Sequence, residues 1–119
     1  MYSAQVLDHF QNPRNPGEVA DADATAEIEN PACGDILRLT LKVQERRIAE
    51  VRFKAKGCVA AIACGSALTE LARGKTLDEA QALRREDVSA ALGGLPQGSS
   101  HAAQLALDAL SGALRSIQS

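Results

Sequence analysis

The residues most able to carry chemistry in this chain of 119 residues are three cysteines, two histidines and one well-placed aspartate. Cys33 lies in the run Pro-Ala-Cys-Gly-Asp, directly before an expected strand. Gly34 permits a positive φ, so a tight turn there can expose the Cys33 thiolate and turn Asp35 toward the same space. The alternative is a turn in which the cysteine is incidental, because free cysteines are often simply buried.

Cys58 and His101 also stand where an expected loop or strand gives way to a helix. Cys58 follows Gly57, and the free N–H groups and dipole of a helix N-terminus favour a thiolate that binds metal or attacks sulfur. Its alternative role is that of a capping or core residue. His101 follows a Gly-Ser-Ser loop, and its alternative role is that of an exposed polar residue near a helix end.

Cysteine and histidine side chains at three separate junctions are what a metal site at one end of a domain requires. Cys33, Cys58 and His101 are far apart in the sequence, unlike the ligands of a zinc ribbon. An odd number of cysteines in a chain without secretory features argues against a disulfide framework. The residue types therefore suggest a metal-binding or sulfur-accepting site rather than cross-links.

Cys64 and His9 are expected to play structural roles. Cys64 shares a helical stripe with Leu68 and Leu71, and six residues along a helix mean roughly 9 Å of rise and about 120° of rotation from Cys58. A straight helix would not aim both thiols at one ion, so we expect Cys64 in the core, with a secondary thiol near the site as the alternative. His9 is expected to be exposed or to cap a helix.

Period-two alternation predicts the strands of the domain. Apolar residues alternate with polar ones over residues 37–43 and again over 51–55, which indicates two antiparallel strands that each bury one face. Residues 25–29 are expected to form a further extended piece. The sequence therefore predicts a β-meander.

Helical spacing and capping residues predict one helix before this meander in the sequence and several helices after it. The first runs from Ser3 to Phe10 with Val6, Leu7 and Phe10 on one apolar stripe. Thr76 and the three residues after it fit a capping box. The remaining helices are expected at residues 59–73, from 87 to about 92, and at 101–117 with an apolar stripe.

Composition and charge exclude several classes of protein. The formal net charge of −2 does not favour nucleic acid, which needs a clustered cationic surface. The apolar stretches are far shorter than the roughly 20 residues that span a membrane, and the start lacks the features of a signal peptide. We expect residues 1–119 to form a single domain of a soluble, cytoplasmic protein with no nucleic-acid or membrane partner.

Several motifs, taken in order along the chain, resemble the IscU/NifU-type iron-sulfur cluster assembly scaffolds. No single motif is specific, but the ordered set covers nearly the whole chain. The matching segments are Asp8-His9-Phe10 with Asn12-Pro13-Arg14-Asn15, Pro31-Ala32-Cys33-Gly34-Asp35, Phe53-Lys54-Ala55-Lys56-Gly57-Cys58 with Ala61-Ile62-Ala63, Gly74-Lys75-Thr76-Leu77-Asp78-Glu79-Ala80, and Leu95-Pro96 before His101.

The resemblance implies an α+β fold, with a three-stranded antiparallel sheet and helices packed on one face. It also implies a carrier rather than an enzyme. Such a scaffold accepts sulfur from a cysteine desulfurase, combines it with iron, and passes a [2Fe-2S] cluster to apoproteins. The site residues carried over by the motifs are Cys33, Asp35, Cys58 and His101, with Asp35 matching the aspartate that tunes cluster lability. Iron or zinc is the metal expected at this site, zinc in the isolated protein.

The sequence departs from the family pattern at three places. Ala102 follows the histidine where the family has a third ligand cysteine, and Cys64 stands where a small polar residue is usual. The family's Pro-Pro-Val-Lys stretch, recognised by a dedicated chaperone, is replaced by Pro-Gln-Gly-Ser from Pro96, which makes that partner doubtful. One alternative is therefore a degenerate member that acts as a zinc-binding or interaction domain. Another is a thiol enzyme with Cys58 as nucleophile and His101 as base.

Overall fold

The computed structural model describes residues 2–31 and 34–118. No helix within those ranges is long and apolar enough to cross a membrane. The elements follow in the order α1 (Ala4–Gln11), β1 (Ala24–Asn30), β2 (Asp35–Gln44), β3 (Arg47–Lys56), α2 (Val59–Ala72), α3 (Leu77–Gln81), α4 (Arg85–Ala91), a short 3-10 turn (Gln97–Ser99) and α5 (Ser100–Gln118).

The three strands form one antiparallel sheet in the order β1-β2-β3. Leu37, Leu39 and Leu41 of β2 are fully buried, so the alternation in the sequence marks the face that packs on the helices. Glu45 and Arg46 join β2 to β3 with φ values of 53° and 61°. Two consecutive residues of positive φ give the hairpin a twist that matches that of the strands.

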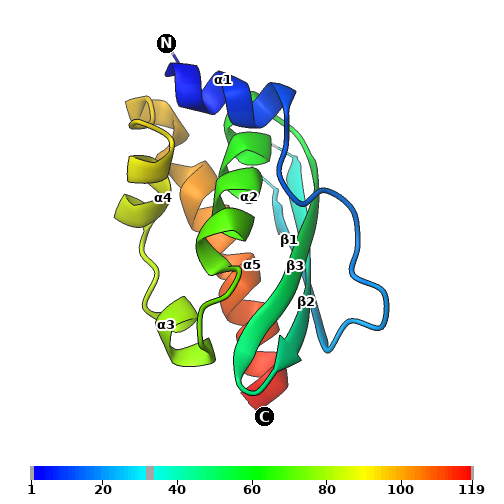
Figure 1. The fold of residues 1–119 in the computed structure, drawn as a ribbon. Coiled ribbons are helices and arrows are strands. Elements are labelled where there is room, and N and C mark those ends of the chain that lie inside the picture. The colour runs from blue at the N-terminus through cyan, green and yellow to red at the C-terminus, as the bar shows by residue number, and fades with distance from the viewer. Residues whose placement is uncertain (1, 32–33, 119) are drawn as a thin grey trace.

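The helices pack on one face of this sheet, as Figure 1 shows. α2 lies at the centre of the fold and is buried around most of its circumference. A Cβ on Gly65 would lie 2.7 Å from the Phe53 ring, so the absence of a side chain allows α2 to approach β3 closely. α5 packs against β1 and α2. The predicted α+β architecture is confirmed.

The segment between α1 and β1 crosses the other side of the sheet. The Phe53 N–H donates to the carbonyl of Asn15 at 3.0 Å, and the Gly17 N–H donates to the carbonyl of Phe53 at 2.9 Å. Farther along the segment, the Val19 N–H donates to Thr40 Oγ1 at 2.9 Å. The segment therefore pairs with the outer edge of β3, which leaves that edge less open to another strand.

The apolar face predicted for α1 is wrong. Leu7 and Phe10 are 42% and 37% exposed, whereas Val6 is fully buried and His9 is only 8% exposed. His9 was expected to be exposed or to cap the helix, but its Nδ1 lies 2.7 Å from Ser66 Oγ on α2. A histidine can replace an apolar residue on a buried face because this hydrogen bond offsets the loss of water.

The predicted helix caps are largely confirmed. The hydroxyl of Thr76 accepts the Glu79 N–H, and the Glu79 carboxylate accepts the Thr76 N–H, so the capping box is complete. α4 begins at Arg85, two residues before the start expected at Asp87. The Asp87 carboxylate accepts the Arg84 N–H at 2.8 Å, so Asp87 closes the first turn from inside the helix.

Candidate metal centre

Asp35 and Cys58 meet at one end of the sheet, where β2 begins and β3 passes into α2. The backbone N–H of Cys58 donates to Asp35 Oδ1 at 3.1 Å. The Cys58 thiol donates to Asp35 Oδ2 over 3.4 Å. Asp35 is only 2% exposed, and these bonds help to satisfy a carboxylate that has been removed from water.

The separation of these two side chains suits a shared metal ion. A sulfur and an oxygen bound to one tetrahedral zinc ion at typical distances of about 2.3 and 2.0 Å lie about 3.5 Å apart. Cys58 Sγ and Asp35 Oδ2 lie 3.4 Å apart. The pair can therefore supply one soft and one hard ligand to the same ion with little rearrangement, once the thiol proton has been lost.

Cys58 is the N-cap of α2, so the helix begins where the sequence predicted and the residue has the capping role that was weighed as the alternative to metal binding. Its sulfur accepts the N–H of Ala61 at 3.4 Å, which satisfies one of the free donors at the helix start. The residue is exposed. A capping role and a ligand role are compatible here, because the residue is exposed while its sulfur lies over the positive end of the helix dipole.

His101 lies in the first turn of α5 and is exposed. It lines a hollow of about 250 Å³ together with Asn30 and Pro31 at the end of β1. Asn30 pairs with Asp35 across the sheet. The fold thus brings His101 to the end of the sheet that carries Asp35 and Cys58, although the three residues come from different elements.

The four-residue site predicted from the sequence is only partly visible. Cys33 lies outside the described residues, and the structure says nothing of its position. Among residues 2–31 and 34–118, no three histidine, cysteine, aspartate or glutamate side chains form a group that could hold a metal ion. Asp35 and Cys58 are brought together, His101 lies at the same end, and the complete set stays a prediction.

Cys64 lies within the core, about one and two-thirds turns of α2 beyond Cys58. It is fully buried. Burial raises the pKa of the Cys64 thiol to about 12, and an ionised Cys58 would act in the same direction. A thiol that stays protonated in an apolar environment is a poor ligand and a poor nucleophile. The core position expected for Cys64 is confirmed.

The sequence did not predict a network of polar side chains between α1 and α2. Ser66 Oγ lies 2.7 Å from His9 Nδ1 and accepts the backbone N–H of Arg14 at 2.8 Å. The Arg14 guanidinium pairs with Asp8 at 2.6 Å and lies 3.9 Å from a carboxylate oxygen of Glu70. The available signal was Ser66 itself, a polar residue in an otherwise apolar part of the central helix.

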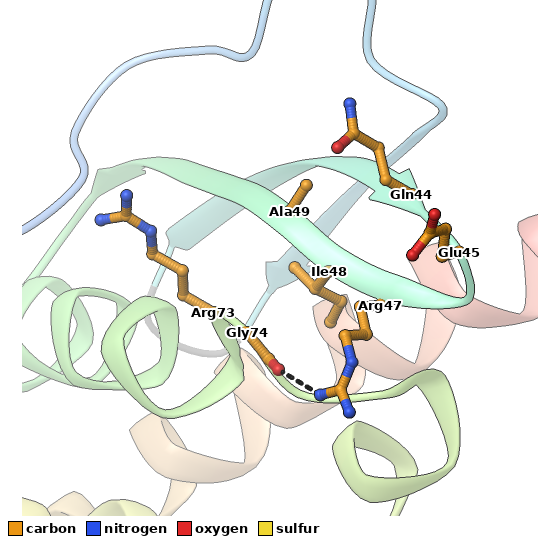
Figure 2. A pocket seen from close by; sticks show the side chains of 7 residues that line it. All are labelled: Gln44, Glu45, Arg47, Ile48, Ala49, Arg73 and Gly74. Atoms are coloured by element: carbon orange, nitrogen blue, oxygen red, sulfur yellow. Dashed lines mark hydrogen bonds between the residues drawn. The ribbon is translucent and has the colours of Figure 1, made fainter.

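A second hollow lies at the opposite end of the sheet and is not part of the candidate site. Its volume is about 700 Å³, and Arg47 and Arg73 are among the residues that line it. Figure 2 shows that the two guanidinium groups point away from each other. Arg47 donates to the carbonyl of Gly74 at 3.0 Å. The two arginines therefore do not converge on one bound group.

Comparison with known sequences finds one matching family model and several similar proteins. Residues 1–119 match the family model described as NifU-like N terminal domain. An iron-sulfur cluster assembly scaffold protein IscU of Archaeoglobus fulgidus is 50% identical over 110 residues, which cover 92% of this chain and 72% of the relative. The scaffold protein IscU of Escherichia coli (strain K12) is 42% identical over 122 residues, which cover 99% of this chain and 94% of the relative.

Solved structures share the fold. A NifU-like protein (N-terminal) from Brucella abortus has a TM-score of 0.78 at 21% identity, covering 98% of this chain and 93% of that one. A putative iron-sulfur cluster assembly scaffold protein for the SUF system from Fervidobacterium islandicum has a TM-score of 0.78 at 23% identity, covering 95% of this chain and 96% of that one. At these identities the likeness concerns the fold alone.

Proposed function

This chain belongs to the family of NifU-like N-terminal domains, and on that premise we propose that it is a scaffold on which iron-sulfur clusters are assembled. The observation that carries the proposal is the pair formed by Asp35 and the exposed residue Cys58, whose ligand atoms lie 3.4 Å apart. Relatives that match most of this chain are named as scaffold proteins. The match over residues 1–119 supports treating the chain as one such domain.

The cluster is the cargo of this protein, and we propose a [2Fe-2S] cluster held by Cys33, Asp35, Cys58 and His101. Cysteine thiolates are soft ligands for iron and accept sulfur, which we expect a cysteine desulfurase to supply. A carboxylate and an imidazole bind iron less firmly than two further thiolates would. The mixed set is therefore suited to release, and apoproteins in the cytoplasm are the proposed recipients.

The replacement of the third cysteine by Ala102 bears directly on this proposal. Ala102 is fully buried at the start of α5, next to the exposed His101. We propose that the histidine takes a ligand position, so that two thiolates, one carboxylate and one imidazole make up the set. A member that binds only zinc is the alternative, and the scaffold names of the relatives do not favour it.

Anaerobic reconstitution tests the proposal. Purified protein is incubated with ferrous iron, cysteine, a cysteine desulfurase and a thiol reductant that reduces the transferred sulfur to sulfide, and its ultraviolet-visible spectrum is followed together with its iron and sulfide content. We expect the absorption bands of a [2Fe-2S] centre in the parent protein. Loss of the bands is expected in Cys33→Ala and in Cys58→Ala, because each removes a thiolate.

Cys64→Ala is the matched control, since it also removes a thiol but one that is buried within the core. We expect it to form the cluster at the level of the parent protein. A parent protein that binds zinc but never develops the bands would instead support the zinc-binding alternative. Equal cluster formation in Cys58→Ala and Cys64→Ala would rule out the proposed site.

A further inference from the structure

Gly57 stands directly opposite the Asp35 carboxylate. The last paired residues of β2 and β3 at this end are Ile36 and Lys56, so the next residues in the antiparallel register are Asp35 and Gly57. Side chains at such opposed positions share one face and are close neighbours. The Asp35 carboxylate can cross to the neighbouring strand only if position 57 offers it space.

The space is available because Gly57 has no side chain. A Cβ added to Gly57 would collide with Asp35 Oδ1 and would lie 2.7 Å from Asp35 Cγ. Contacts this short do not occur between real atoms of this kind, so the carboxylate would have to move. Gly57 also has a φ of +145°, a conformation that other residues rarely adopt.

The position of this carboxylate determines how it meets Cys58. Oδ1 accepts the Cys58 N–H at 3.1 Å, and this bond leaves Oδ2 beside the Cys58 sulfur at 3.4 Å. If Oδ1 were displaced, the bond to the backbone would break and Oδ2 would leave the sulfur. The separation that suits a shared metal ion would then be lost.

We propose that Gly57 is a positioning residue: its missing Cβ leaves the space in which Asp35 binds the backbone of Cys58 and is aimed at the same ion as the Cys58 sulfur. This inference deepens the proposed function and rests on it for its metal. Its geometric part concerns the metal-free protein, and can be tested without any cluster.

Hydrogen exchange at the Cys58 amide reports the geometry. In reduced, chelator-treated protein, we expect Gly57→Ala to speed exchange of this amide, measured by nuclear magnetic resonance, about tenfold, as loss of a bond to a charged acceptor does. Asp35→Ala should have the same effect. Adding Gly57→Ala to Asp35→Ala should then change the Cys58 amide little, because the colliding carboxylate has already gone.

Gly74→Ala is the matched control. Gly74 also has a positive φ, of +85°, but a Cβ there would meet no atom within 4 Å, and the residue lies at the other end of the sheet. We expect the Cys58 amide of this variant to exchange as in the parent protein. This variant controls for a strained glycine position elsewhere in the fold, and the double variant with Asp35→Ala separates strain at position 57 from the collision with the carboxylate.

Zinc affinity, measured against a competing chelator, provides a second readout. Loss of the groups that orient metal ligands typically lowers metal affinity by about 10 to 100-fold. We expect Gly57→Ala to lower zinc affinity by a factor in this range. A parent protein that binds no metal would overturn the proposed site, while the exchange result would still decide whether Gly57 positions Asp35. The two failures are thus distinguishable.

Three results would overturn the inference. One is an unchanged Cys58 amide in Gly57→Ala, and another is an equal acceleration by Gly57→Ala whether Asp35 is present or replaced by alanine. The third concerns folding. If Gly57→Ala does not fold, the variant that also carries Asp35→Ala is expected to fold, and failure of both would assign the defect to the backbone alone.

Discussion

Burial gives the two described thiols different chemistry. Cys58 is exposed at the start of α2, whereas Cys64 lies within the core, where burial raises its pKa to about 12. The same residue type thus provides a reactive group at one position and a small apolar side chain at the other. The two roles differ because six residues of helix separate Cys58 from Cys64, so the second thiol points into the core.

Alkylation of the native apoprotein tests this difference. With excess iodoacetamide near pH 8, we expect Cys58 to be modified within minutes and Cys64 to stay unmodified until the protein is unfolded. The reason is that Cys64 is both inaccessible and protonated at that pH. Peptide mapping by mass spectrometry measures both sites, and modification of Cys64 at the rate of Cys58 would contradict the buried position.

His9 makes the stability of the fold depend on pH. Burial lowers the pKa of His9 below its usual value, and the Arg14 cation acts in the same direction. The carboxylates of Glu70 and Asp8 oppose this shift without cancelling it. As the pH falls below roughly 6.5, the unfolded chain therefore takes up a proton more readily than the folded protein does.

The sign of this linkage leads to a measurable loss of stability. The part of the free energy of unfolding that depends on a neutral His9 is fully present above about pH 6.5. It decreases as the pH falls toward the lowered pKa of His9 in the folded state. We expect the melting temperature of the parent protein to fall more steeply from pH 7.5 to 5 than that of His9→Gln. Parallel curves for the two proteins would show that His9 does not carry this dependence.

Among the elements, α5 illustrates how one helix holds the fold together. Its apolar stripe packs against β1 and α2 while its first turn carries His101. Leu110 is 2% exposed and Leu114 is 1% exposed, so the stripe predicted from the sequence is the face that is buried. The packing of this helix therefore fixes the position of His101 relative to the sheet.

Truncation of Leu110 measures this packing. We expect Leu110→Ala to lower the free energy of unfolding by about 2 to 5 kcal/mol, because it removes buried methyl groups and leaves a cavity. Leu7→Ala is the control, since Leu7 is 42% exposed on α1 and should cost no more than about 0.5 kcal/mol. Denaturant titration measures both variants, and equal losses would contradict the assigned burial.

In the whole molecule, the candidate site and the hollow near Arg73 occupy opposite ends of the same strands. β2 spans 10 residues from Asp35 to Gln44, and such a strand is roughly 30 Å long. Charges separated by this distance scarcely interact in solvent, since the screening length at physiological salt is about 8 Å. The two regions should therefore behave independently.

Charge reversal at the hollow tests this independence. We expect Arg73→Glu to leave the metal content and cluster yield of the protein within the variation between preparations of the parent protein. Metal analysis and the reconstitution spectrum measure the effect. A loss of cluster comparable to that in Cys58→Ala would mean that the two ends of the sheet are coupled through the fold.

Much of the architecture follows from the sequence because its signals are local. Alternation along β2 and the reciprocal bonds of Thr76 and Glu79 arise between residues close together in the chain, so these predictions are confirmed. The orientation of α1 could not be predicted in this way. His9 is buried only because Ser66, far along the chain, supplies a hydrogen-bond partner.

The same distinction applies to the candidate site. The sequence by itself identified Cys33, Asp35, Cys58 and His101 as candidate residues and predicted that a helix begins at or beside Cys58. Only the tertiary structure decided that Asp35 bonds to Cys58 and that Gly57 must lack a side chain to allow it. These contacts join the start of β2 to the turn between β3 and α2, 23 residues farther along the chain. Their distances depend on how these two segments meet, which no pattern within either segment specifies.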